Sequence, residues 1–159
     1  MAKGDKRAKA FRPPAATTGK TPKATPPAGS PQDETPHFCF RHADRRSRNP
    51  WVFKPQGADA EALFGFMRDM CQSPWKEILG QRTGNFTRHR KHHDQPVESI
   101  VQEAQDDYAA AKLDEVFGDD PIFRFRLTGE QRLWGFRRGR VFHVVWWDPN
   151  HLVYPTEPN

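Results

Sequence analysis

Val141-Phe-His-Val-Val-Trp-Trp147, followed by Asp148-Pro-Asn-His-Leu-Val-Tyr154, organises the rest of this chain. The first stretch is β-branched and aromatic almost throughout, and this composition predicts a strand that is buried on at least one side. Polar side chains crowd the end of that strand: Asp148, Asn150, His151 and Tyr154. Many active sites are built from polar groups held at the end of a rigid apolar strand.

Two more strands are predicted just before this one. Ile122-Phe-Arg-Phe-Arg-Leu127 alternates, with three apolar side chains on one face and Arg124 and Arg126 on the other. Gln131-Arg-Leu-Trp-Gly-Phe136 forms the second strand. Because both connections are short, the three strands must form an antiparallel meander. The register stays open, since two-residue and three-residue turns place Arg132 on different faces relative to Arg126.

The chain before the meander supplies one strand and several helices. His37–His42 alternates and predicts a short strand, and helices are predicted after Gly57, at 75–79 and from 96 to about 117. This order predicts one α+β domain over residues 37–155, followed by a C-terminal tail at 156–159. The expected architecture is a small antiparallel sheet, made of the N-terminal strand and the meander, with two or three helices on one face.

The N-terminal segment differs in composition from the rest of the 159 residues. Residues 1–36 contain seven of the fifteen prolines and four of the five net positive charges. The segment is predicted to be a disordered basic tail, because it cannot bury enough apolar area to offset its ordering entropy. It either keeps the domain soluble or adds affinity for a polyanion such as RNA.

Several classes of protein are excluded by what the chain lacks. No secretory apolar segment follows Met1 and no apolar run is long enough to span a bilayer, so we expect a cytoplasmic protein without a membrane partner. Cys39 and Cys71 are expected to be free thiols in that compartment. The chain contains no Cys-x-x-Cys pair, which argues against a cysteine zinc site.

Residues 122–154 resemble the RelE/ParE-like toxin superfamily. The resemblance is carried by Phe123-Arg-Phe-Arg-Leu-Thr-Gly-Glu-Gln-Arg-Leu-Trp-Gly-Phe136, Val141–Trp147 and His151-Leu-Val-Tyr154. Members of that superfamily typically show a strand bearing arginine, a glycine turn, a second strand opening with Tyr-Arg or similar, a third apolar strand and a closing His…Tyr. The Trp-Trp-Asp-Pro-Asn run before His151, the basic stretch at 81–94 and the N-terminal tail depart from this pattern.

The resemblance implies a RelE-like fold and a toxin activity, metal-independent cleavage of mRNA, usually on the ribosome. It also implies an antitoxin protein as partner, and no cofactor. Arg126 falls where the family places a basic residue on the first strand, and Arg132 falls on the arginine that contacts phosphate. His151 and Tyr154 fall on the closing pair. The superfamily also contains gyrase poisons and members without catalysis, so a similar fold does not establish activity.

The chemistry of RNA cleavage points to the same residues. Attack by the 2′-hydroxyl needs a base, a cation that holds the developing charge, and an acid for the leaving oxygen. Arginine suits the cation, because its planar guanidinium binds phosphate through two hydrogen bonds. We therefore expect Arg126 and Arg132 to clamp phosphate, His151 to act as acid or base, Asp148 to orient it, and Tyr154 to stack on a base or donate a proton.

Each of these assignments has a structural alternative. His151 can cap its turn, Asp148 can be a turn residue, and Tyr154 can anchor the C-terminal tail by packing. Arg124 and Arg126 can belong to the solvated face of an antiparallel sheet. Trp146 and Trp147 are not expected to point inward together, and Trp147 is interpreted as an exposed platform for RNA bases or a protein partner.

The basic loop Arg88-His-Arg-Lys-His-His93 is the second candidate site. It is expected to contact RNA through Arg88, Arg90, Lys91 and His93, together with Arg124 on the sheet. His92 or His93 supplies a further acid or base in this hypothesis. The alternatives are a solvated charged loop and, if the loop is helical, a metal site made of its histidines.

Three functions remain open at this point. The first is a metal-independent endoribonuclease of the RelE-like toxin type. The second is a non-catalytic RNA-binding or protein-binding module on the same fold, which the nearly neutral net charge of residues 37–159 favours slightly. The third is an interaction protein encoded by a mobile element, which uses Trp147 and the C-terminal tail.

Overall fold

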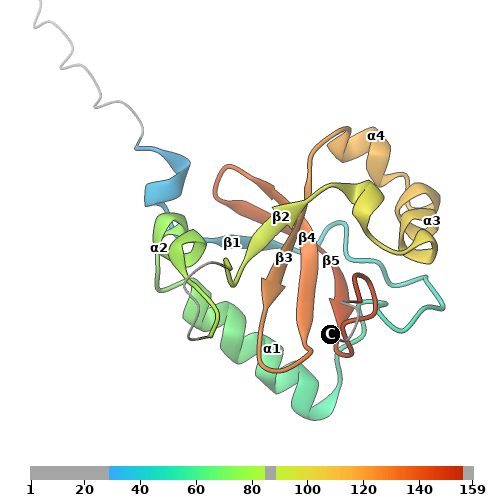
Figure 1. The fold of residues 1–159 in the computed structure, drawn as a ribbon, viewed down its shortest axis with the longest axis horizontal. Helices are drawn as coiled ribbons and strands as arrows, with labels where there is room; N and C mark the ends of the chain where they lie inside the picture. The colour runs from blue at the N-terminus through green and yellow to red at the C-terminus, as the bar shows by residue number, and fades with distance from the viewer. Residues whose placement is uncertain (1–28, 85–88, 156–159) are drawn as a thin grey trace, which may run out of the picture.

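The computed structural model describes residues 29–84 and 89–155, which form an α+β fold around a five-stranded mixed sheet. The strand order is β1-β5-β4-β3-β2 (Figure 1). The strands are β1 (His37–Cys39), β2 (His93–Gln95), β3 (Ile122–Arg126), β4 (Arg132–Arg138) and β5 (Val141–Asp148). Within the described ranges, no helix has the length and apolar character needed to cross a membrane.

The meander of β3, β4 and β5 is confirmed, and its register is now defined. Arg126 lies directly opposite Arg132, so both side chains project from the same face of the sheet. The connection runs from Leu127 to Gln131 and is longer than either turn considered from the sequence. It is closed by a hydrogen bond from the Leu127 N–H to the Gln131 carbonyl at 3.0 Å.

The prediction of an all-antiparallel sheet was wrong at one edge, and the strand at the other edge was not predicted. β1 pairs in parallel with β5, with Phe38 opposite Phe142. Nothing local fixes this direction, because a long crossover separates the two strands and such a crossover permits parallel pairing. At the other edge, β2 arises from the stretch that was expected to be irregular, and it pairs antiparallel with β3.

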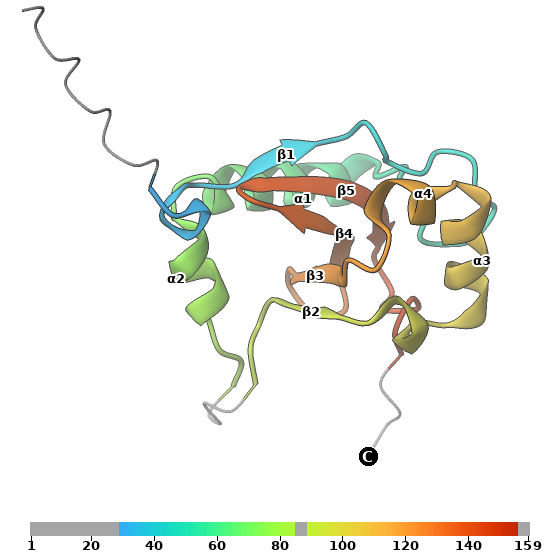
Figure 2. The same cartoon turned by 90° about the horizontal axis from the view of Figure 1, so that it is seen from above.

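Helices cover both faces of the sheet, which corrects the expectation of a single covered face. Two pairs of helices are separated in space in Figure 2. One pair is α1 (Gly57–Met70) and α2 (Trp75–Gly80), and the other is α3 (Gln102–Ala110) and α4 (Leu113–Phe117). Two separate apolar clusters correspond to these two pairs of helices. A strand that is buried on both sides carries a nearly continuous apolar run, and β5 is such a strand.

The two tryptophans of β5 are both buried, one in each cluster. Trp146 is fully buried with α3 and α4, and Trp147 is 3% exposed among the residues beside α1 and α2. The expectation that Trp147 forms an exposed platform for RNA or a partner was therefore wrong. A single covered face would have left one indole in solvent, but the second layer of helices covers it.

A bulge in the β4–β5 pair changes which side chains of the two strands lie opposite each other. The register shifts between Trp134 and Gly135, so that Val145 has no direct partner on β4. Gly135 is required at this point, because a Cβ atom there would collide with the backbone carbonyl of His143. The close approach of two backbones is a common reason for glycine inside a strand.

The helical segment predicted from 96 to about 117 is divided into three pieces. A short 3-10 turn at Val97–Ser99 precedes α3, and Lys112 separates α3 from α4. Lys112 has a φ of 55°, in the left-handed region that ends regular helices.

The folded part begins before His37, earlier than the predicted domain boundary. A 3-10 turn spans Pro31–Asp33, and the Trp75 N–H donates to the Glu34 carbonyl at 3.0 Å. Asp33 also accepts a hydrogen bond from Lys76 at 2.9 Å. The remainder of the predicted tail, residues 1–28, lies outside the described residues, as do 156–159. Cys39 and Cys71 are both free thiols, as expected.

Candidate functional site

Three arginines gather on one face of the sheet, at the end where β3 meets β4. Arg124 and Arg126 share a face because they are two residues apart in β3, and Arg132 lies opposite Arg126. None of the ion pairs found in the described part of the chain includes any of these three. The buried Asp148 lies opposite Arg132 on β5 and raises the pKa of both Arg124 and Arg132, against the larger lowering effects of burial and of the neighbouring arginines. The three arginines thus form a cationic cluster without a close ion pair among the described residues, which we call the arginine cluster.

Arg124 joins two histidines from distant parts of the chain. Its Nη2 lies 2.7 Å from Nε2 of His93, and its Nη1 lies 3.4 Å from Nε2 of His151. A guanidinium can only donate, so each Nε2 must be an acceptor and each imidazole is neutral. Nδ1 of His93 lies 3.1 Å from the Asp94 carbonyl oxygen, which fits a proton on that atom. His151 and Arg132 therefore lie on the same side of the sheet, as the nuclease hypothesis requires.

Asp148 holds the turn that carries His151. Its carboxylate is fully buried and accepts from the N–H groups of Leu152 at 2.9 Å and Val153 at 3.0 Å. It also accepts from Trp134 Nε1 at 3.2 Å. Asp148 makes no hydrogen bond to the imidazole among the described contacts, and its charge acts on His151 by raising the pKa of the imidazole against the larger effects of burial and the arginines. It positions the residue through the backbone.

The backbone of His151 is itself unusual. Its φ is 56°, in the left-handed region that residues with a side chain seldom adopt. The hydrogen bonds to Asp148 on the two following residues hold this conformation. Local strain that the surroundings maintain is more common at functional sites than elsewhere.

The electrostatics of the cluster favour an anion. Burial, followed by Arg132 and Arg124, lowers the pKa of His151 to about 4. Burial, followed by Arg124 and Arg126, also lowers the pKa of Arg132 to about 10. The repulsion between the three cations would be relieved by a bound anion. The buried Nε atoms of Arg124 and Arg132 have no hydrogen-bond partner, so both guanidiniums retain unused donors.

Arg132 and Tyr154 contribute to the site in different ways. Arg132 is almost entirely buried, and its Nη1 donates to the carbonyls of Gly129 at 2.8 Å and Gln131 at 2.9 Å. These bonds leave Nη2 without a hydrogen-bond partner among the described residues, while Nε is buried. Tyr154 is partly buried against the apolar cluster of α3 and α4. Burial, followed by Arg126, lowers the pKa of Arg124, and Tyr154 lies close enough to act in the opposite direction. Tyr154 therefore both packs against the core and lies near the arginine cluster, two roles that the sequence alone left as alternatives.

The basic loop contributes less than expected. Arg88 lies outside the described residues, and Arg90 is exposed and lines a pocket away from the arginine cluster. The Lys91 N–H donates to the Gln81 carbonyl at 2.9 Å, which closes the loop, but no contact joins its side chain to the cluster. Among the described residues of this loop, only His93 makes a hydrogen bond with the side chain of one of the three arginines. Among the residues that the structure describes, no three His, Cys, Asp or Glu side chains are placed to hold a metal ion.

His92 is a structural residue, which removes it as an acid or base. Its side chain is fully buried. Nδ1 accepts from the Arg126 N–H at 3.0 Å, and Nε2 lies 3.2 Å from Gln81 Oε1. Burial, followed by the charges of Lys91 and Arg124, lowers the pKa of His92 to about 3. The neutral imidazole thus accepts a backbone hydrogen bond from β3, next to the residue pair His93–Arg124 at which β2 begins.

The neutral state of His92 predicts acid sensitivity. Between pH 6.5 and 3 the unfolded chain binds a proton at this residue that the folded chain does not, so stability falls as the pH falls through this window. We expect the contribution of His92 to the unfolding free energy to drop by roughly 2 kcal/mol between pH 7 and 4.5. Urea unfolding of wild type and His92→Gln at both pH values measures it. The exposed His37→Gln variant is the control, and an equal pH dependence in all three proteins would contradict the assignment.

Comparisons of the chain with protein-family models, with curated proteins and with solved structures found no match. The resemblance to RelE/ParE-like toxins therefore remains a prediction. The function has to be inferred from the chemistry of the site alone.

Proposed function

We propose that this protein is a metal-independent endoribonuclease of the RelE-like toxin type, and that the arginine cluster holds the phosphodiester to be cleaved. The observation that carries the proposal is the position of His151 beside three guanidiniums that form no close ion pair among the described residues. Three cations near a single buried carboxylate, Asp148, leave an excess of positive charge that suits an external anion, and RNA offers one at every nucleotide. The expected substrate is mRNA, on the ribosome, in the cytoplasm, with an antitoxin protein as the regulating partner.

The hydrogen bonds of Arg124 indicate how a substrate would activate His151. Arg124 donates to the Nε2 atoms of both His93 and His151. A phosphate oxygen is a stronger acceptor than an imidazole, because the hydrogen bond is then between two charged groups. Phosphate binding draws the guanidinium toward the ligand and releases Nε2 of His151. The neutral imidazole is then ready to accept a proton.

The chemical step follows from these positions. The proton of the 2′-hydroxyl moves to His151 Nε2 while the 2′-oxygen forms a bond to phosphorus. The arginine cluster stabilises the charge that develops on the phosphorane oxygens. The bond from phosphorus to the 5′-oxygen breaks, and the Tyr154 hydroxyl gives that oxygen its proton. The products are a 2′,3′-cyclic phosphate and a 5′-hydroxyl end.

A non-catalytic RNA-binding module on the same fold is the second candidate. It is favoured by the hydrogen bonds that occupy both imidazole Nε2 atoms and by the nearly neutral charge of residues 37–159. Binding without turnover distinguishes it from the nuclease. Mapping of the 5′-hydroxyl ends after incubation with RNA provides that measurement.

Binding of RNA is expected to depend on Arg126, which has neither an ion pair nor a side-chain hydrogen bond in the described ranges 29–84 and 89–155. Arg126→Met should weaken binding of an uncleavable 2′-deoxy oligonucleotide about tenfold and reduce the salt slope by about one. Arg138→Met is the matched control, because Arg138 lies on β4 and pairs with Asp120 at 2.6 Å. Equal losses in the two variants, or none in Arg126→Met, would reject the arginine cluster as the phosphate site.

A further inference from the structure

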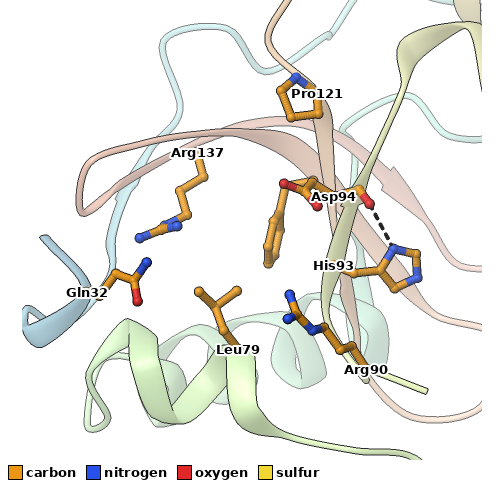
Figure 3. Close-up of a pocket in the computed structure, with 8 residues that line it drawn as sticks. Gln32, Leu79, Arg90, His93, Asp94, Pro121 and Arg137 are labelled. Atoms are coloured by element: carbon orange, nitrogen blue, oxygen red, sulfur yellow. Dashed lines mark hydrogen bonds between the residues drawn. The ribbon is translucent and has the colours of Figure 1, made fainter. Parts of the chain in front are cut away.

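A pocket of about 250 Å³ lies on the opposite face of the sheet from the arginine cluster. It is bounded by α2, by β2 and by the beginning of β3 (Figure 3). Its apolar walls are Leu79, Pro121 and Phe123, and its polar walls include Arg90, Asp94 and Arg137. Pockets for drug-sized ligands usually measure roughly 300–1,000 Å³, so this one suits a single ring system.

Arg137 is held in place, but not all of its hydrogen-bond donors have a partner. Its guanidinium carbon lies 4.6 Å from the centroid of the Trp75 ring, and its Nε is buried without a hydrogen-bond partner. Burial lowers the pKa of Arg137, and the Asp94 carboxylate acts in the opposite direction. β4 extends through Arg138, beyond the predicted end of this strand at Phe136, and the Arg137 side chain lines the pocket.

Asp94 places a carboxylate across the pocket from Arg137. It lies opposite Phe123 in the β2–β3 pair, and Figure 3 shows its carboxylate turned toward the pocket while the ring of His93 turns away. No ion pair joins Asp94 to Arg137 or to Arg90 among the described residues. A pair of acceptor oxygens and two guanidiniums thus surround a space with apolar walls, and all three charges remain available to a ligand.

We propose that this pocket binds a guanine base. Guanine presents two adjacent donors, N1–H and N2–H, which match the two oxygens of the Asp94 carboxylate. Its O6 and N7 are two adjacent acceptors, which match a guanidinium fork from Arg137 or Arg90. Adenine, cytosine and uracil each lack the pair of adjacent donors. Phe123 and Leu79 offer apolar surface to the faces of the ring.

The pocket and the arginine cluster are connected by one edge strand. His93 and Asp94 are neighbours in β2 and point to opposite faces, the first to Arg124 and the second to the pocket. A nucleic acid strand that crosses this edge can place a phosphate beside Arg124 and a base beside Asp94. The inference rests on the proposed function for the source of the guanine, whereas guanine recognition itself depends on the pocket alone.

Binding of free nucleotides to the full chain tests the pocket without any cleavage. Guanosine, adenosine and cytidine 5′-monophosphates carry the same phosphate, so a difference between them in calorimetry reports the base. We expect guanosine monophosphate to bind about tenfold more tightly than the other two. Equal affinities, or no measurable binding of guanosine monophosphate, would overturn the proposal.

Asp94→Asn is the decisive variant, because an amide offers one acceptor where guanine needs two. Asp94 is exposed, so the substitution is expected to leave folding unchanged, which thermal unfolding checks. The preference for guanine should disappear in Asp94→Asn and persist in Asp69→Asn, whose carboxylate on α1 pairs only with the neighbouring Arg68. Persistence of the preference in Asp94→Asn would also overturn the assignment.

Mapping of RNA ends separates this inference from the proposed function. Guanine-selective nucleotide binding without RNA cleavage would reject the nuclease and keep the pocket. Cleavage at sites unrelated to guanine, together with equal nucleotide affinities, would reject the pocket and keep the nuclease. Cleavage next to guanine that becomes indifferent to sequence in Asp94→Asn would support both.

Discussion

His151→Gln is expected to lower the rate of RNA cleavage by about 10²–10⁴-fold, the range for removal of a general acid or base. Binding of an uncleavable oligonucleotide should change little, because the three arginines proposed to hold phosphate remain. Glutamine keeps a polar side chain of similar reach but cannot accept a proton. The loss should therefore appear in the single-turnover rate rather than in affinity. Single-turnover cleavage and equilibrium binding of the same RNA sequence measure the two effects.

The pH dependence distinguishes a catalytic imidazole from one that only maintains the turn. Burial, Arg132 and Arg124 lower the pKa of His151 to about 4. A bound phosphate offsets the two guanidinium charges, so the pKa should rise toward its ordinary value in the complex. A base must be unprotonated, and the wild-type rate should therefore fall as the pH decreases through that raised pKa.

The variants make this test specific. The acid limb of the rate profile should vanish in His151→Gln and persist in His37→Gln, in which an exposed histidine of β1 is replaced. A His151→Gln protein that is folded and cleaves RNA at the wild-type rate would refute the catalytic role. The same profile in all three proteins would refute it as well.

Asp148→Asn is expected to reduce the unfolding free energy by roughly 3 kcal/mol. The carboxylate is fully buried, and its two oxygens accept from Leu152, Val153 and Trp134. The asparagine amide has one oxygen, so its NH₂ group must face at least one of these donors. Buried donors left without an acceptor cost far more than the net gain from an ordinary hydrogen bond.

Urea unfolding of Asp148→Asn at neutral pH measures this effect. Asp33→Asn removes a carboxylate from an exposed pair with Lys76 and should change the unfolding free energy by less than about 1 kcal/mol. Where Asp148→Asn remains folded, cleavage should also fall, because the turn that carries His151 loses its support. A loss of stability no larger than that of Asp33→Asn would show that Asp148 does not hold the turn.

Local patterns were sufficient to predict the meander. The alternation in 122–127 assigns Phe123 and Phe125 to one face and Arg124 and Arg126 to the other, whatever the register. Short connections then require antiparallel neighbours. The place of Arg132 was not predictable, because it depends on the length of the connecting loop. That loop includes Leu127 and Gln131, which the sequence pattern had assigned to the strands.

The same local reasoning could identify His151 and Asp148 as parts of a polar turn. It could not show which of them supports the turn and which contacts the arginines. The positions of donors around a carboxylate depend on the backbone path of the turn, which composition does not specify. Burial of Trp147 was missed for a related reason. An apolar strand does not reveal whether one layer of helices or two will cover it, and here α1 and α3 lie on opposite sides.

Local sequence patterns thus determine the three adjacent strands, the faces on which their side chains lie, and the polar turn at the end of β5. Long-range pairing alone decides that β1 runs parallel to β5 and that β2 joins the sheet at all. His93 and His151 meet at Arg124 only because β2 pairs with β3. Such contacts arise when packing and hydrogen bonding offset the entropy of closing long loops, and that balance belongs to the whole fold rather than to any segment.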